Sequence, residues 1–203
     1  MSIVLRLALL LALLGLPGCA TPRTQWGLRF ADWLLAAYPD PWALHGGGWE
    51  YNAGIVLYGL SRVYVQSGEV RYRDYIQRWV DHFVDAEGRV AIASSQNLDL
   101  IQPGLLLLFL YEETGDPRYR RAADQVLARL AAHPRNALGG FWHKDIYPQQ
   151  MWLDGLYMAG PFCVRHARLW GAGDLCPAEA LRQAARLTQH TQDPASGLLY
   201  HAW

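Results

Sequence analysis

The chain has 203 residues, of which 52% are hydrophobic and 18% are charged, and its 18 basic and 18 acidic side chains leave no formal net charge at pH 7. A balanced charge argues against nucleic acid or an anionic membrane surface as a partner. The length is ample for one domain with a sizeable hydrophobic core.

The N-terminus has the pattern of an export signal. A single early cation, Arg6, precedes an unbroken apolar run that is too short to cross a membrane as a helix. Residues 1–19 are therefore predicted to be a secretory signal peptide. The segment Leu16–Cys19 resembles a bacterial lipobox, so Cys19 is a predicted lipidation site, with simple signal cleavage as the alternative. We expect an exported protein, periplasmic or anchored to the membrane only through a lipid on Cys19, with residues 20–203 as the N-terminal part of one catalytic domain.

Apolar periodicity and turn residues predict a chain of helices after the signal. Proline at the first helical position, where its missing N–H is not needed, marks several of the predicted starts. The predicted helices are 25–37, 49–66, 71–84, 103–113, 117–132, 148–170 and 177–192.

Two segments of the chain repeat each other. YVQSGEVRYR begins at Tyr64 and YEETGDPRYR begins 47 residues later, at Tyr111, while a weaker copy, LWGAGDLCPA, begins at Leu169. Each copy joins the end of a helix, a tight glycine turn and the start of a new helix. A period of this length built from helix pairs indicates a helical array or an α/α toroid.

The two helices of a pair differ in surface. Helix 103–113 is apolar on nearly all sides, whereas helix 117–132 has a charged face. The first type must be surrounded by protein and the second faces water, so inner and outer helices alternate. We therefore predict an all-α protein with the layout of an α/α barrel.

The loops that lead from an outer to an inner helix hold most of the reactive and aromatic side chains. If the inner helices all run in one direction, these loops open at the same end and form one polar, aromatic-lined mouth. The alternative is that each tryptophan or histidine only packs its own loop. The loops contribute His45, Trp49 and Glu50; Gln96, Asn97 and Asp99; Trp142, His143, Lys144 and Asp145; and Tyr200, His201 and Trp203.

Asp154 is the first candidate for acid–base chemistry. It is predicted to lie in the second turn of helix 148–170, among apolar neighbours and on one face with Gln150, Tyr157 and Met158. Loss of hydration there would favour the protonated carboxyl that a general acid needs.

Asp99 is the second candidate carboxylate. It precedes Pro103, just outside a predicted helix N-terminus, where unpaired N–H groups favour the ionised form. A role as a helix cap fits the same position. Two carboxyl groups held in different protonation states are typical of sugar chemistry.

The segment from Trp142 to Asp145 supplies further candidates. His143 lies between Trp142 and the only lysine of the chain, Lys144. All other basic residues are arginines, so a lysine here suggests a role for a compact ammonium group that a planar guanidinium cannot fill. His143 could instead be a loop histidine bonded to the backbone. Asp145 is predicted to be a surface or lysine-pairing residue.

Two cysteines remain after the signal. Cys163 lies inside an apolar helical run and Cys176 follows a glycine-rich turn, so we expect them to be too far apart to form a disulfide. The chain has no Cys/His spacing of a zinc site, and no metal is expected.

Five segments of the chain resemble the unsaturated rhamnogalacturonyl hydrolases, glycoside hydrolase family 105, which are related to the unsaturated glucuronyl hydrolases. The segments are WLDGLYMAGPF, GGFWHKDIYPQQ, NLDLIQPG, TGDPRYRRAAD and DPASGLLYHAW, and the resemblance runs from Trp26 to Trp203. It implies a six-hairpin, (α/α)6 barrel, of which this chain supplies an incomplete arc of about seven helices. It implies no metal or organic cofactor.

The resemblance also implies an activity. Enzymes of this kind remove a 4,5-unsaturated galacturonyl residue from the non-reducing end of rhamnogalacturonan oligosaccharides left by pectin lyases. Asp154 would protonate the vinyl ether and activate water, and hydration at C5 would give an unstable hemiketal that falls apart. Asp99 and His143 would lie around the unsaturated sugar. The predicted substrate-binding residues are Trp49, Tyr51, Trp142, Lys144, Gln150, Trp152 and His201.

Several alternatives stay open from the sequence. Such relatives continue well beyond the YHAW segment, so we expect a truncated reading frame or a fragment that is inactive or poorly soluble by itself. The chain could also be an unsaturated glucuronyl hydrolase acting on glycosaminoglycan fragments. It could be a non-catalytic surface lipoprotein that binds sugar, or an inactive remnant.

Overall fold

The computed structural model describes residues 22–171 and 175–203, and all regular secondary structure in this part is helical. The all-α prediction is therefore confirmed. No helix within the described part is long and apolar enough to cross a membrane. The predicted signal peptide and Cys19 lie outside the described residues. The α-helices are α2 (Pro22–Ala37), α3 (Tyr51–Ser67), α4 (Val70–Phe83), α5 (Gly104–Thr114), α6 (Pro117–Ala131), α7 (Gly155–Trp170) and α8 (Leu175–Thr191), and the 3-10 helices are η1 (Pro41–Gly46) and η2 (Leu98–Leu100).

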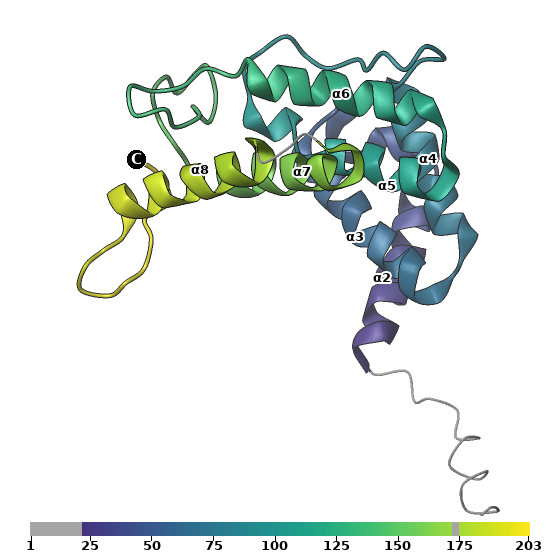
Figure 1. The fold of residues 1–203 in the computed structure, drawn as a ribbon. Coiled ribbons are helices and arrows are strands. Elements are labelled where there is room, and N and C mark those ends of the chain that lie inside the picture. The colour runs from purple at the N-terminus through teal and green to yellow at the C-terminus, as the bar shows by residue number, and fades with distance from the viewer. Residues whose placement is uncertain (1–21, 172–174) are drawn as a thin grey trace, which may run out of the picture.

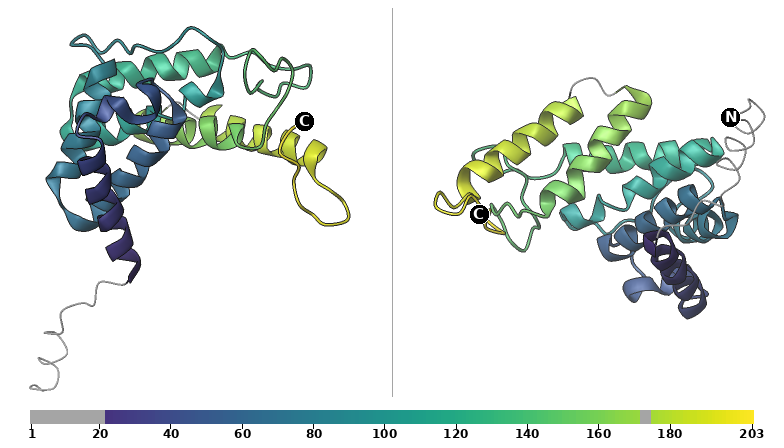
Figure 2. Two further views of the ribbon diagram at one scale, coloured as in Figure 1. Left: turned by 180° about the vertical axis from the view of Figure 1, so that it is seen from behind. Right: turned by 90° about the horizontal axis from the view of Figure 1, so that it is seen from below.

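The helices form hairpins that follow one another along an open arc. Helix α3 packs with α4, α5 with α6, and α7 with α8. Figure 1 shows α2 at one end of the arc and α8 at the other, and the two views of Figure 2 show the same order. Helices α3, α5 and α7 also contact one another in sequence, α3 with α5 and α5 with α7. They are the inner layer of the arc, as the α/α barrel layout requires.

Helix α5 is the centre of the hydrophobic core. No side chain from Leu105 to Leu110 is more than 4% exposed. At its first residue, a Cβ on Gly104 would lie 2.7 Å from the ring of Phe162, so glycine is needed for α5 and α7 to approach this closely. The prediction that an all-apolar helix must be surrounded by protein is confirmed.

Glycine turns close the hairpins at the repeated positions. Gly68, Gly115 and Gly171 follow α3, α5 and α7 with φ of 72°, 69° and 74°, which is the left-handed conformation that glycine adopts without strain. The amide of each bonds back to a carbonyl in the last turn of the preceding helix. The repeated sequence motif is therefore a repeated helix end.

Helix α7 begins later than the sequence predicts. The expected start was 148, whereas the structure begins the helix at Gly155. The amides of Met151 and Leu153 bond to the carbonyls of Trp203 and His201, at 2.7 and 2.6 Å, and so are taken by a distant segment. Apolar composition alone could not separate this bridged stretch from a helix.

Cys163 and Cys176 form a disulfide between α7 and α8, contrary to the expectation that they lie too far apart. Their Cα atoms are 5.2 Å apart. The physical reason is the hairpin, since two antiparallel helices bring positions on either side of the turn face to face. A disulfide fits an oxidising compartment.

Removing this disulfide should destabilise the protein. The cysteines are separated by 13 residues, and a loop of this size predicts a loss of about 3 kcal/mol in the free energy of unfolding for the double variant Cys163→Ser, Cys176→Ser. Urea unfolding measures this loss, and reductant should bring the wild type to the stability of the variant. Equal urea midpoints for the oxidised wild type and the double variant would show that the disulfide does not stabilise the fold.

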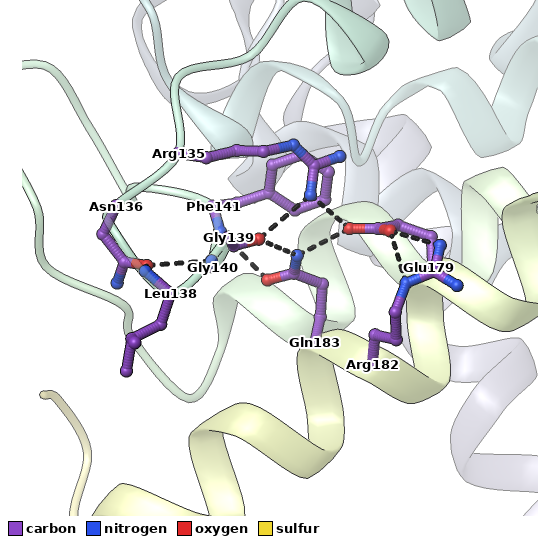
Figure 3. A network of polar contacts seen from close by, with 9 residues as sticks. All are labelled: Arg135, Asn136, Leu138, Gly139, Gly140, Phe141, Glu179, Arg182 and Gln183. Carbon is purple, nitrogen blue, oxygen red and sulfur yellow. Dashed lines mark hydrogen bonds and ion pairs between the residues drawn. The ribbon is translucent and has the colours of Figure 1, made fainter.

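A polar network pins the loop before α7 to helix α8 (Figure 3). The buried Gln183 donates to the carbonyl of Gly139 at 2.9 Å and accepts from the amide of Phe141 at 2.9 Å. Glu179 accepts from Gln183 at 2.7 Å and pairs with both Arg135 and Arg182. The loop that leads to the site is thus held by side chains of α8.

Acid should weaken this network. Partial burial would raise the pKa of Glu179, but hydrogen bonds from Arg135, Gln183 and Arg182 lower it from 4.5 to about 2. A depressed pKa contributes stability above the unfolded value, and that stability is lost as the pH falls from about 4.5 to about 2.

The matched variant is Glu179→Gln, which cannot ionise. At pH 6 it should be less stable than the wild type by about 2 kcal/mol in urea unfolding. This difference should shrink as the pH is lowered towards 3. A difference that stays constant between pH 6 and pH 3 would show that the charge of Glu179 does not stabilise the fold.

Candidate active site

Three distant segments are joined by backbone hydrogen bonds next to the start of α7. The amide of Leu98 bonds to the carbonyl of His143 at 3.0 Å, and Asn97 and Lys144 form an antiparallel bridge. The amide of Leu153 bonds to the carbonyl of His201, as described above. These bonds bring together the predicted loops that contain Asp99, His143 and His201.

The side chains brought together are two carboxylates and two imidazoles. Nε2 of His143 lies 3.6 Å from Oδ1 of Asp99, and its Nδ1 lies 4.0 Å from Oδ1 of Asp154. Nε2 of His201 lies 3.8 Å from the same Asp154 oxygen. These separations are longer than hydrogen bonds but leave the groups next to one another. The predicted cluster of Asp154, Asp99 and His143 is therefore present.

Asp99 is buried and paired with Lys144. It lies in η2, and its carboxylate is 2.7 Å from the ammonium nitrogen of Lys144. Burial would lower the pKa of Lys144, but the hydrogen bond and charge of Asp99 raise it overall. The lysine therefore carries its charge inside the site. Asp145 does not pair with the lysine, since its carboxylate accepts from the amide of Gln96 at 3.2 Å.

The loop before α3 reaches the site through Glu50 and the first residue of the helix, Tyr51. Burial and the charge of Asp99 raise the pKa of Glu50, against the opposing effect of Lys144. The charges of Tyr51 and Glu50 also act on Lys144. The sequence places Glu50 only in the aromatic-lined mouth and predicts no catalytic or substrate-binding role for it. The one signal for it was the composition of its loop.

His143 is held by aromatic contacts rather than by hydrogen bonds from its ring. Its side chain is 2% exposed, and the indole of Trp152 stacks on it with a centroid distance of 4.5 Å and an angle of 5°. Tyr147 stacks on Trp152 at 4.8 Å, and Gln150 accepts a hydrogen bond from the indole N–H at 3.0 Å. Burial lowers the pKa of His143 despite the neighbouring carboxylates of Asp154 and Asp99. The imidazole is therefore neutral at pH 7.

Asp154 differs in position from the sequence expectation. It is the residue that precedes α7, and its carbonyl accepts from the amides of Tyr157 and Met158. Its side chain is 37% exposed, so it is not held dry among apolar neighbours, and Gln150 does not share a helix face with it. A carboxyl that is open to solvent on one side and close to His143 on the other can reach a bound substrate.

Gly155 allows this close arrangement. A Cβ at this position would lie 3.2 Å from the side chain of Leu98 and 3.5 Å from Nδ1 of His143. The first residue of α7 therefore packs directly against η2 and the imidazole. A small residue at position 155 lets the start of α7 lie close to Leu98 and His143.

Asp99, His143 and Asp154 each offer one ligand atom, and these atoms lie within 4.8 Å of one another, so the group could hold a metal ion. The ammonium of Lys144, 2.7 Å from Asp99, already supplies a positive charge there and would repel a divalent cation. The residues present thus suit an acid–base centre better than a metal centre.

Not every predicted aromatic contact lies at the cluster. Trp49 is 3% exposed, donates its indole N–H to the carbonyl of Leu100 at 2.9 Å and stacks on Trp79. The prediction that Trp49 contacts substrate is wrong, because its ring is part of the hydrophobic core. Trp142 is half-buried and Gln150 is exposed. Their contacts with substrate stay predictions, as do those of Tyr51, Lys144, Trp152 and His201.

Comparison with known proteins decides the class. Residues 26–203 match the family model described as Glycosyl Hydrolase Family 88. The chain belongs to glycosyl hydrolase family 88. Within this family 88 chain, the acid–base cluster and every described helix after α2 fall inside the matched region, which begins within α2.

Two relatives agree with this assignment. The unsaturated rhamnogalacturonyl hydrolase YesR of Bacillus subtilis (strain 168) is 30% identical over 162 residues, which are 76% of this chain and 45% of that protein. A solved family 105 glycoside hydrolase from C. acetobutylicum ATCC 824 is 30% identical, with a TM-score of 0.77 over 86% of this chain and 49% of that one.

A second solved structure, a possible family 105 member from Klebsiella pneumoniae, is 27% identical, with a TM-score of 0.73 over 92% of this chain and 52% of that one. The predicted resemblance to family 105 and the arc of an α/α barrel are confirmed. The family 88 chain spans about half the length of the relatives it matches.

The stack of Trp152 on His143 should control the protonation of the imidazole. Trp152→Leu removes the ring that keeps water from His143, so the pKa of His143 should rise towards its ordinary value of 6.5. Trp152→Phe keeps an aromatic ring there and should leave the pKa of His143 nearly unchanged. An NMR titration of the imidazole protons measures both variants, and the same titration curve in all three proteins would refute the effect.

Proposed function

We propose that this chain carries the acid–base centre of a glycosidase that removes a 4,5-unsaturated galacturonyl residue from rhamnogalacturonan oligosaccharides. The observation that carries the proposal is the cluster of Asp99, His143 and Asp154 beside the charged Lys144. The 30% identity to a protein named as an unsaturated rhamnogalacturonyl hydrolase supports the substrate class.

The chemistry requires a proton donor that reaches the sugar. An unsaturated uronic acid has a vinyl ether between C4 and C5, and protonation adds hydrogen to C4. Water then adds its oxygen to C5 and gives up a proton, which leaves a hemiketal that opens and releases the remaining sugar. The partly exposed carboxyl of Asp154 is placed to donate the first proton.

Groups next to Asp154 would accept the proton that the attacking water releases and would provide a positive charge within the site. His143 is neutral and adjacent to Asp154, so it can accept a proton from the attacking water or return one to the carboxyl. Asp99 is committed to the ammonium of Lys144, which fixes a positive charge within the site. The ammonium has further N–H donors besides the one that Asp99 accepts, and these could bind a substrate carboxylate.

We also propose that the protein is exported. The apolar segment before Cys19 has the composition of a signal peptide. The disulfide between α7 and α8 supports an oxidising compartment. Attachment through a lipid on Cys19 is part of the same proposal and would be seen as a mass increase on the mature N-terminus.

The deciding variant is Asp154→Asn, which keeps the shape of the side chain but cannot donate a carboxylic proton. Turnover of an unsaturated rhamnogalacturonan disaccharide, followed as loss of vinyl-ether absorbance, should fall by about 10²–10⁴-fold. Binding of the disaccharide should persist. The control is Asp74→Asn, an exposed carboxylate on outer helix α4, which should retain full turnover.

The assay uses the 203-residue chain and a chain extended with the second half of a relative. Asp154→Asn with turnover close to that of the wild type would overturn the role of Asp154. Binding without turnover in both wild-type forms would favour a sugar-binding protein. Turnover of glycosaminoglycan disaccharides in place of pectic ones would favour a glucuronyl hydrolase.

A further inference from the structure

A cavity lies next to the acid–base cluster and shares the bordering residues Trp152 and Gly155 with it. It is a cavity of about 320 Å³ between α6, α7 and α8, and the loop before α7 closes part of it. Asp99, His143 and Asp154 do not line it, although Trp152 and Gly155 border it. The cavity therefore adjoins the proposed reaction centre but contains none of its acid–base groups.

Small residues on the facing helices create the cavity. Ala159 and Gly160 of α7 face it together with Ala180 of α8 and Ala131 of α6. Side chains of this size cannot fill the space between helices, whereas the core around α5 is closed by leucines and Phe162. The hollow is thus encoded by the sequence of three separate helices.

The lining is chemically suited to an aromatic body. Leu127, Leu130 and Leu156 provide aliphatic walls, and Phe141 and Met151 provide an aromatic ring and a thioether. Aromatic rings and sulfur both make favourable contacts with a bound ring. An apolar cavity of about 150 Å³ holds benzene, so this one has room for a fused pair of rings.

The rim of the cavity is polar and carries an excess of positive charge. Arg135, Glu179, Arg182 and Gln183 line it, and Figure 3 shows them converging around Glu179. The amide of Gln183 is fully used by Gly139, Phe141 and Glu179. Two guanidinium groups face one carboxylate, so one positive charge remains for an anion. Arg182 is the more exposed of the two and has N–H groups to spare.

We propose that this cavity binds an aromatic carboxylate, with the rings between α6, α7 and α8 and the carboxylate at Arg182. The cavity is distinct from the acid–base cluster, so this inference does not depend on the proposed glycosidase activity.

Methionine methyl groups provide a direct test, because the chain has only three methionines. Met151 lines the cavity, whereas Met158 is buried elsewhere in the core. Titration of methyl-labelled protein with 2-naphthoate should shift the Met151 signal until it saturates and leave the Met158 signal in place. No saturable shift of Met151 in the folded wild type would overturn the proposal.

Variants separate the cavity from nonspecific binding. Ala180→Leu and Ala159→Leu each fill part of the space and should weaken 2-naphthoate by about tenfold or more. Ala185→Leu lies on the exposed face of the same helix α8 and should bind as the wild type does. Unchanged affinity in a folded cavity-filling variant would overturn the site. Two filling variants are used so that one folded protein remains for the comparison.

The contribution of the charge is tested with a neutral probe. Arg182→Gln should weaken 2-naphthoate by about fivefold. It should not change the affinity for 2-naphthalenemethanol, which has the same rings without the carboxylate. Equal affinities of wild type and Arg182→Gln for 2-naphthoate would overturn the role of the rim.

Discussion

The site depends on backbone hydrogen bonds between loops that are far apart in the sequence. Leu98 bonds to His143, and Leu153 bonds to His201, so the segments before α5, before α7 and after α8 are fixed to one another. Each inner helix alone would present one loop to solvent. The bridges turn these loops into a single surface on which two carboxylates and two imidazoles meet. The cost is that residues before α7 cannot join the helix.

Burial and charge act in opposite directions on the groups of this surface. Burial keeps His143 neutral, while the pairing with Asp99 keeps Lys144 charged. Glu50 is affected by both influences, because its burial and Asp99 raise its pKa and Lys144 lowers it. A site with a neutral imidazole, a fixed cation and a solvent-accessible carboxyl can move protons without a change in its overall geometry. Such an arrangement is typical of acid–base enzymes.

Predictions from the sequence were correct where neighbouring residues alone determine the structure. The glycine at each repeated turn and the apolar run of α5 predicted hairpins and an inner helix, because a left-handed turn and an all-apolar surface each allow few alternatives. Asp99, His143 and Asp154, which the sequence named as candidates for separate reasons, lie next to one another in the structure. The family resemblance added what composition could not, namely the enzyme family.

Predictions from the sequence were wrong where the structure of a residue depends on its contact with a distant segment. The stretch before Gly155 is apolar enough for a helix, but the C-terminal segment takes its amides. Trp49 belongs to a loop rich in site residues, yet the carbonyl of Leu100 and the ring of Trp79 hold it in the core. Cys163 and Cys176 meet only because a hairpin folds them together. In each case the partner is a feature of the folded chain.

Gly155 sets a limit on how this protein could be altered. A Cβ there would require the side chain of Leu98 to move by a few tenths of an ångström and would make ordinary contact with Nδ1 of His143, so a side chain longer than that of alanine would press on both. Ile146, in the loop before α7, is 70% exposed and so has room around its side chain. A larger side chain is therefore accommodated by solvent at position 146, whereas at position 155 it is met by the neighbouring helix start and imidazole.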